Sequence, residues 1–434
     1  MSGESVRRSM APRLAVAAAS FGVVLALTYG VYGPVLDVRP LSGDNLYILD
    51  WADRTPLATA LGTVDPDFYP EWRPLAYATV WLQYRWAGLD HVKSYSLVNM
   101  VLWAVCAWLV YRLVLMLAHS AAAGLLAAWF VIADSRPLFA VAGIIERQSS
   151  LACCFGLLAM LCVLGSRKDQ LTRLECAGVL LLLLAAAFSK EYGLAFAGAV
   201  AAHALVQHQG RVAVPAVVAV VTYVGLRMAL AEGAMGSYCE ETGYFFAVRG
   251  VCYDSLSGTA VSQSAYNVMA TLSGIVLPGL FTGIGQIAVS PRWLAKSVLW
   301  LAVATLGCWK NRRSRSMTLS LVGFNAALSL LLYRDRNQLP ALVGFATAVG
   351  VGLAALDEQL QARGSRRIRT LAAALLIALL TVQSIRTRAL VLAEVADLLE
   401  QDPCGAFGDF PHLDADFVKH IKSKYGMSNP GCVE

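Results

Sequence analysis

The sequence predicts an all-α, polytopic membrane fold with about eleven transmembrane helices, a large first extracytoplasmic loop and one interfacial helix. Of 434 residues, 57% are hydrophobic and only 15% are charged, whereas soluble chains average about 25% charged residues. The apolar residues form runs of about 16–24, long enough to cross a hydrocarbon core of roughly 30 Å. Basic residues lie in short clusters between these runs, as in cytoplasmic loops of membrane proteins.

The first span is expected at about 14–36. Arg7, Arg8 and Arg13 precede it, which resembles a signal peptide, but the run is too long for a signal sequence and lacks a small-residue cleavage site. We therefore expect a retained first helix with the N-terminus inside. The later spans are expected at about 96–117, 119–138, 149–165, 174–188, 192–207, 212–230, 293–309, 316–333, 338–356 and 370–386.

The segment 264–288 is apolar enough to span, but we expect it to lie at the interface. If it spanned, the basic residues from Lys310 to Arg315 would be placed outside, against the positive-inside rule. Its glycines and Pro278 also disfavour a straight helix. The chain then divides into a transmembrane domain at 1–386 and a short extracytoplasmic tail at 387–434. Within the domain, 37–95 forms the first extracytoplasmic loop and 231–290 a second extracytoplasmic segment.

Four cysteines lie outside the predicted spans, and all four fall in segments placed on the extracytoplasmic side. They form two local pairs, Cys239 with Cys252 and Cys404 with Cys432. Disulfides persist in oxidising compartments, so the sequence predicts two disulfides, and their placement agrees with the predicted topology.

Charged residues at the outer edges of the spans are the candidate site. Ionisable groups at membrane depth are costly, and by default they indicate function. Asp44 lies only eight residues beyond the first span, where a carboxylate can act as a general base on an acceptor hydroxyl. Three further charged pairs or triplets stand at span edges, where arginine and lysine suit phosphate binding as well as structural ion pairs. They are Glu146-Arg147, Lys190-Glu191 and Arg334-Asp335-Arg336.

Several short segments resemble, in the same order, those of polytopic glycosyltransferases of the protein-O-mannosyltransferase-like class, which share the GT-C fold and use polyprenyl-phosphate sugars. The resemblance covers roughly residues 14–350, and its strength lies in the order of the set. The segments are Glu71–Leu75 (EWRPL), Tyr84 with Gly88–Asp90 and Asn99, Ile144–Leu151 (IIERQSSL), Phe188–Glu191 (FSKE) and Leu332–Pro340 (LYRDRNQLP).

The resemblance implies inverting transfer of a sugar from a polyprenyl phosphate to an acceptor hydroxyl. By position, Asp44 is the implied catalytic base. The implied lipid-phosphate ligands are Arg147, Lys190, Arg334 and Arg336, whereas Glu71, Arg73, Glu146 and Glu191 are expected near the acceptor or in the loop that shapes the site.

The chain also departs from the family pattern. Histidines that relatives carry near the second span are replaced here by residues such as Ser96 and Trp103, and Asp44 is followed by Asn45 where many relatives have a second acid. The tail is too short for a C-terminal helical-repeat array. These differences leave the acceptor open.

Other classes of function receive less support. The clustered basic residues do not indicate nucleic acid, no metal-ligand spacing is present, and no cofactor is required, although a divalent metal stays open. The expected partners are a polyprenyl-phosphate-linked sugar, an extracytoplasmic acceptor (glycan, lipid or protein) and the bilayer, in a bacterial cytoplasmic membrane. The alternatives are a transporter or flippase of a lipid-linked sugar, a polysaccharide polymerase or ligase of the cell envelope, and a non-catalytic scaffold. A transporter would be expected to carry charges near the bilayer midplane and internal repeats.

Overall fold

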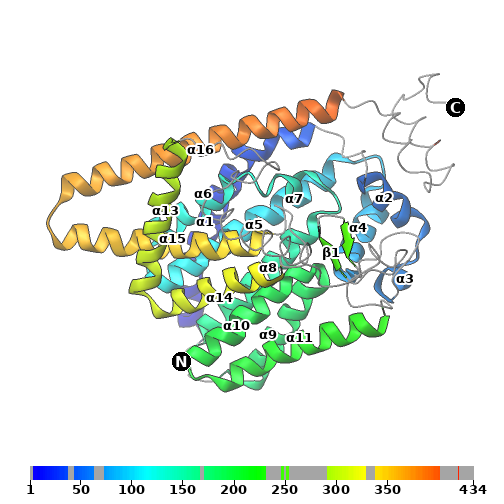
Figure 1. The fold of residues 1–434 in the computed structure, drawn as a ribbon, viewed down its shortest axis with the longest axis horizontal. Coiled ribbons are helices and arrows are strands. Elements are labelled where there is room, and N and C mark those ends of the chain that lie inside the picture. Colours follow the sequence, from blue (N-terminus) through cyan, green and yellow to red (C-terminus); the bar gives the residue numbers. More distant parts are fainter. Residues whose placement is uncertain are drawn as a thin grey trace.

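A computed structural model describes residues 3–37, 44–62, 73–166, 171–230, 246–248, 251–253, 291–328, 338–400 and 419 (Figure 1). These residues form a helical bundle. Its elements are α1 (Gly3–Tyr32), η1 (Gly33–Asp37), α2 (Asp44–Arg54), α3 (Leu57–Gly62), α4 (Pro74–Ala87), α5 (Lys93–Ala118), α6 (Ala121–Ile132), α7 (Leu138–Ala142), α8 (Arg147–Gly165), α9 (Arg173–Ser189), η2 (Glu191–Gly193), α10 (Leu194–Val206), α11 (Gly210–Leu230), β1 (Phe246–Val248), β2 (Val251–Tyr253), α13 (Pro291–Lys310), α14 (Arg312–Leu328), α15 (Leu339–Ala362) and α16 (Arg366–Glu400).

The all-α class holds for the described residues, apart from one small hairpin. In the segment between α11 and α13, β1 and β2 pair antiparallel with Phe246 opposite Tyr253. Each strand has three residues. The predicted interfacial helix at 264–288 lies outside the described residues.

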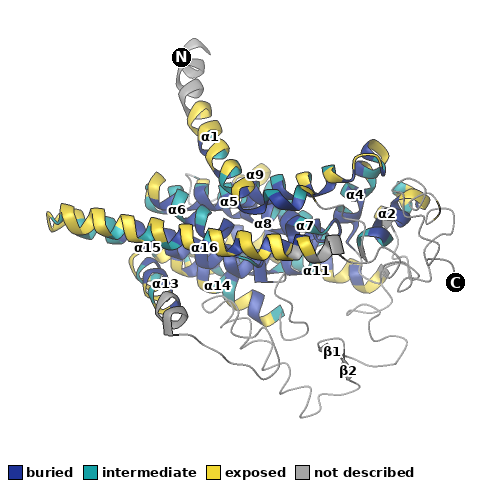
Figure 2. Ribbon diagram, turned by 90° about the horizontal axis from the view of Figure 1, so that it is seen from above, coloured by how far each residue is buried: buried dark blue, intermediate teal, exposed yellow. Residues whose placement is uncertain are grey.

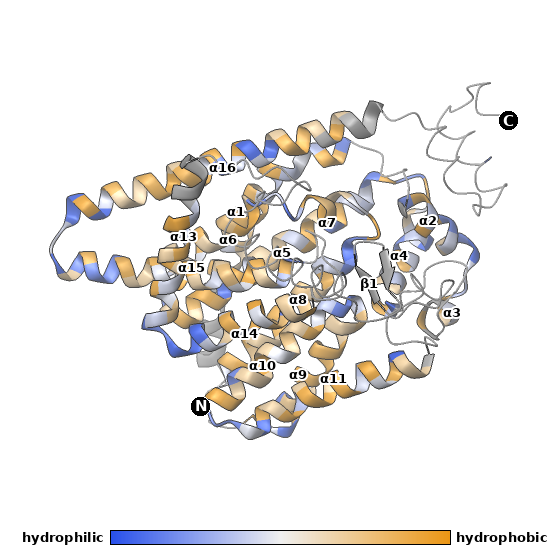
Figure 3. Cartoon of the chain, in the orientation of Figure 1, coloured by the Kyte–Doolittle hydropathy of each residue, from blue (hydrophilic) through white to orange (hydrophobic). Residues whose placement is uncertain are grey.

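Among the residues that the structure describes, six helices are long and apolar enough to cross a membrane. Figure 3 shows the apolar character of the helices. Three further apolar helices, at 121–132, 191–206 and 297–310, are shorter. The chain is thus a polytopic membrane protein, whereas the count of eleven spans stays a prediction. The six long segments are Leu14–Asp37, Lys93–Ala118, Arg147–Gly165, Gly210–Ala229, Leu339–Ala362 and Arg366–Ala393.

Two helices differ in length from the predicted spans: α6 is shorter than expected and α16 is longer. The span expected at 119–138 is only the 12-residue helix α6. Ser120 caps its start by accepting a hydrogen bond from the Ala123 amide at 3.2 Å, and a polar turn follows its end. By contrast, α16 continues past the expected end at 386 to Glu400, because no glycine or proline interrupts that stretch.

Helix α15 lies at the centre of the bundle, and α1 and α16 lie at its outside. In α15, 94% of the apolar window is buried, against 17% in α1 and 6% in α16 (Figure 2). A Cβ placed on Gly352 would lie 1.9 Å from the Val303 carbonyl oxygen, and one on Gly307 2.1 Å from that of Ala348. These glycines therefore let the backbones of α13 and α15 touch, the close approach that small residues permit in membranes.

The described part of the segment between η1 and α5 contains a small helical unit of α2, α3 and α4. Its own apolar cluster includes Leu46, Leu49 and Val80, and it extends to Ile144 and Ile145 before α8. This cluster docks the helical unit against the end of the bundle at which α8 begins, and we call this end the outer end. At its edge, burial and then the Asp53 carboxylate raise the pKa of Tyr84 above its usual range, so the phenol stays protonated.

Candidate functional site

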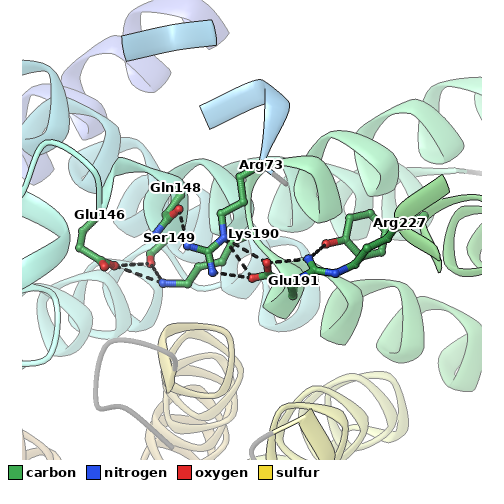
Figure 4. A network of polar contacts seen from close by, with 8 residues as sticks. Arg73, Glu146, Gln148, Ser149, Lys190, Glu191 and Arg227 are labelled. Atoms are coloured by element: carbon green, nitrogen blue, oxygen red, sulfur yellow. Dashed lines mark hydrogen bonds and ion pairs between the residues drawn. The ribbon is translucent and has the colours of Figure 1, made fainter. Parts of the chain in front are cut away.

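The turn between α9 and α10 positions two adjacent charged residues toward different partners. Helix α9 ends at Ser189, Lys190 is extended, and η2 begins at Glu191. Gly193 makes this turn possible, because a Cβ there would lie 2.3 Å from the backbone of Ala186. Lys190 then faces the start of α8, and Glu191 faces α4 and α11 (Figure 4).

Lys190 is buried at the start of α8. Its Nζ donates to Glu146 Oε2 at 3.2 Å and to Ser149 Oγ at 2.8 Å. Ser149 Oγ also donates to Glu146 Oε2 at 3.2 Å. Lys190 is 3% exposed and Glu146 4%, so this ion pair is desolvated and hydrogen-bonded, as a buried charge requires.

Glu191 is shared by two arginines. Arg73 donates from Nη2 to Glu191 Oε2 at 2.9 Å and from Nε at 3.1 Å to Oε1. Arg227, near the end of α11, donates from Nη1 to Glu191 Oε1 and to the Tyr223 hydroxyl, both at 2.9 Å. Two guanidinium groups on one carboxylate keep that carboxylate ionised.

Gln148 joins the two halves of this arrangement. Its Oε1 accepts a hydrogen bond of 2.8 Å from Arg73 Nη1, and Ser149 beside it belongs to the Lys190 contacts. The result is one polar network that links four elements across the outer end of the bundle (Figure 4). We call it the outer network; its members are Arg73, Glu146, Gln148, Ser149, Lys190, Glu191, Tyr223 and Arg227.

Arg147 is next to the outer network in sequence but points elsewhere. Arg147 is 1% exposed. Its Nε donates to Asn99 Oδ1 at 2.8 Å, and its Nη1 donates to the Thr79 carbonyl oxygen at 3.2 Å. Its Nη2 donates to Gln83 Oε1. In the described part of the chain its hydrogen-bond partners are all neutral oxygens. Its guanidinium therefore fastens α8 to α4 and α5 and adds a buried positive charge behind the network.

The start of α2 lies against the same end of the bundle. Asn45 Oδ1 accepts a hydrogen bond of 2.7 Å from the Ile144 amide, and Ile144 is two residues from Glu146. Asp44 is the first residue of α2, so its backbone is held beside this loop. The Asp44 side chain is outside the described part of the structure.

A second buried cluster anchors the start of α15. Arg136 donates to both Asp134 carboxylate oxygens, at 2.7 and 2.8 Å, and from Nη1 to Gln338 Oε1 at 3.2 Å. Tyr32 donates from its hydroxyl to the Asp134 carbonyl oxygen at 2.5 Å. Gln338 is the residue before α15, so this cluster holds the start of that helix.

The structure brings four of the predicted site residues into one network: Arg73, Glu146, Lys190 and Glu191. Arg147 lies behind them, and Asp44 stands at the start of an adjacent helix. Glu71, Arg334, Arg336, Cys239, Cys404 and Cys432, and the side chain of Cys252, lie outside the described residues, so both disulfides stay predictions.

Sequence reasoning missed Arg227, Gln148 and Ser149. Arg227 had a signal, since it is a charged residue inside the apolar run 212–230. The two uncharged residues lie in the segment Ile144–Leu151 that carries the resemblance, but their role depends on which side chains face them. Within the described ranges, no three His, Cys, Asp or Glu residues are grouped so as to hold a metal.

Comparison with known proteins gives a fold but no family. No protein-family model and no curated protein sequence matches the chain. Among solved structures, the chain is similar to the oligosaccharyltransferase of Archaeoglobus fulgidus in its apo form, with a TM-score of 0.53 and 13% sequence identity. The match covers 94% of this chain and 59% of that chain. This likeness confirms a GT-C-like fold, and at this identity it concerns the fold alone.

Proposed function

We propose that the protein is a membrane glycosyltransferase that moves a sugar from a polyprenyl-phosphate donor to an extracytoplasmic acceptor hydroxyl, with inversion. The observation that carries the proposal is the outer network. It gathers the cations Arg73, Lys190 and Arg227 at one end of a GT-C-like bundle, beside the helix that begins with Asp44. The fold shared with an oligosaccharyltransferase supports the reaction class.

The chemistry needs a base at the acceptor and positive charge at the leaving group. Asp44 would take the proton of the acceptor hydroxyl as that oxygen attacks the anomeric carbon. The bond from the anomeric carbon to the phosphate oxygen breaks, and the phosphate leaves with the electron pair. Cations aimed at the developing phosphate charge lower the barrier most when they are held in a desolvated site.

Among the described residues, Lys190 and Arg227 are the best placed for the phosphate. Lys190 is a compact cation held by one carboxylate and one hydroxyl. Arg227 donates only through Nη1 within the described structure, which leaves Nε and Nη2 for a ligand. Arg334 and Arg336 complete the proposed phosphate site, whereas Arg147 would act from behind, through its charge and by holding α4 and α5.

The site's location follows from the same proposal. With the N-terminus inside, the outer network faces the extracytoplasmic side of a bacterial cytoplasmic membrane. The acceptor would then approach through the first loop, which contributes Arg73 to the outer network and contains Glu71 two residues earlier in the sequence.

The test is turnover of a panel of polyprenyl-phosphate sugars by purified protein in lipid, measured as release of polyprenyl phosphate. Asp44→Asn should abolish turnover, whereas Asp37→Asn, an exposed acid of the same region, should not. Turnover that survives in Asp44→Asn would keep the class and remove Asp44 as base. Transbilayer movement of the intact donor without release of polyprenyl phosphate would replace the proposal by a flippase.

A further inference from the structure

A groove lies on the outside of the described bundle, between α1, α16 and α6. Its volume is about 430 Å³, within the range of about 300–1,000 Å³ typical of small-molecule sites. Its walls are mostly apolar, with Val23, Leu27, Gly30, Trp129 and Ile385 among the lining residues. The polar side chains of α16 that line it are Thr381, Ser384 and Arg388.

Polar contacts hold α16 in place along this groove. Trp129 Nε1 donates to Ser384 Oγ at 2.8 Å, and Thr387 Oγ1 donates to the Ala133 carbonyl oxygen at 2.6 Å. Arg388 donates from Nη1 to the Gly30 carbonyl oxygen. A Cβ placed on Gly30 would meet no atom within 4 Å, so the wall is open at that point.

The groove faces the membrane. The helices α1 and α16 are the least buried of the six candidate spans, at 17% and 6%, and Val23 and Ile385 are 50% and 64% exposed. Whatever fills the groove must therefore come from the bilayer. Apolar walls with one cation at the end fit a lipid that carries a phosphate.

The cationic end of the groove lies near the Asp134–Arg136 cluster. Thr387, next to Arg388, bonds to Ala133, and Ala133 precedes the Asp134–Arg136 cluster at the outer end of the bundle. An arginine at this depth extends its guanidinium toward the lipid head groups. Within the described chain, no carboxylate pairs with Arg388, so a lipid phosphate can supply the anionic partner.

We propose that this groove binds one membrane phospholipid, with an acyl chain along α1 and α16 and the phosphate on Arg388. The groove is separate from the proposed transfer site, since no member of the outer network lines it. The bound lipid fills the space between the first and the last helix. This assignment does not depend on the proposed glycosyltransferase activity.

The test uses the full chain in vesicles of phosphatidylcholine with a small fraction of phosphatidylglycerol that carries a diazirine in one acyl chain. After photolysis, crosslinks are mapped by mass spectrometry. The expected crosslinks concentrate in peptides that contain 23–31 and 381–388. Arg388→Gln should lower their yield about tenfold, the size expected for one lost charge-assisted contact of 1.4 kcal/mol. Gly30→Leu should block the groove and lower the yield similarly.

Matched variants distinguish a site from general lipid contact. Arg386→Gln removes an exposed arginine two residues away, and Gly22→Leu adds the same side chain where a Cβ also meets nothing within 4 Å. Neither residue lines the groove, so both variants should crosslink like the parent chain. Equal yields in all five proteins would show annular lipid only and overturn the proposal.

Competition identifies the lipid class. Excess unlabelled phosphatidylglycerol should reduce the crosslinks at 381–388, and the same amount of polyprenyl phosphate should compete less. Stronger competition by polyprenyl phosphate would overturn the assignment to a phospholipid. All variants replace membrane-exposed positions, and replacement of a helix glycine by leucine favours the helix. Unchanged thermal unfolding in detergent confirms that each variant is folded.

Discussion

Glu191 compensates two buried arginines, which makes it the most sensitive single residue of the outer network. Glu191→Gln should lower stability by about 3 kcal/mol, the lower end for breaking a buried pair, because the amide keeps a hydrogen-bond acceptor but no charge. Its thermal transition in detergent should fall clearly. Asp357→Asn is the control, since the Asp357–Arg369 pair is 42–48% exposed and such pairs contribute about 0–1 kcal/mol. Equal shifts in both variants would contradict the prediction.

We expect Arg147 to stabilise the bundle through the geometry of its three hydrogen bonds as well as through its charge. Arg147→Met leaves Asn99 and Gln83 without their buried donor, at a cost of about 1–3 kcal/mol for each unsatisfied group. Arg147→Lys should restore little, because lysine lacks the planar fork that reaches three acceptors. The measurement is thermal unfolding of both variants beside the parent chain. Full stability in the lysine variant would show that only the charge matters.

The charged residues could be predicted from the sequence, but their pairing could not. Lys190 and Glu191 are adjacent in the sequence, so an ion pair between them is the simplest expectation. The extended backbone at Lys190 instead turns them to different partners, Glu146 and Arg73. That turn depends on how Gly193 packs against Ala186, a contact that no local pattern records.

Among the helices, α13 and α15 make the closest contact, and it depends on glycines. Gly352→Ala places a methyl group against the Val303 carbonyl oxygen, and overpacking of this kind costs about 1–3 kcal/mol. Gly178→Ala in α9 is the control, because a Cβ there meets nothing within 4 Å, and alanine favours a helix by about 1 kcal/mol. The expected result is a lower unfolding temperature for Gly352→Ala only. A neutral Gly352→Ala would mean that the two helices can separate without cost.

Hydropathy predicted where most helices lie and was less successful with their lengths. The 26-residue α5 matches its expected span closely. Helix α9 has 17 residues and α6 has 12, fewer than the roughly 20 that cross a bilayer unaided. Their apolar residues bury against neighbouring helices, a tertiary effect that a window of hydropathy does not separate from membrane exposure.

Among the described residues, the buried ion pairs lie at the end of the bundle where α8 and α15 begin, and the exposed arginine clusters lie where α14 begins and α15 ends. This polarity predicts the orientation, with Arg312–Arg315 and Arg363–Arg369 inside. A membrane-impermeant maleimide applied to intact cells should label Pro56→Cys, between α2 and α3, and not Ala362→Cys, at the end of α15. The parent chain corrects for native thiols, and permeabilised cells should expose both positions. The reverse labelling pattern would invert the topology.

Helices α1 and α16 pack against each other, and this has a consequence for biogenesis. Arg388 of α16 donates a hydrogen bond to the Gly30 carbonyl oxygen of α1, and the two residues are 358 apart in sequence. When α1 leaves the ribosome, α16 has not been synthesised, so α1 must first reside in the membrane without this neighbour. Its apolar surface suits it to that state. The contact between α1 and α16 therefore forms late in assembly, after α16 has been inserted.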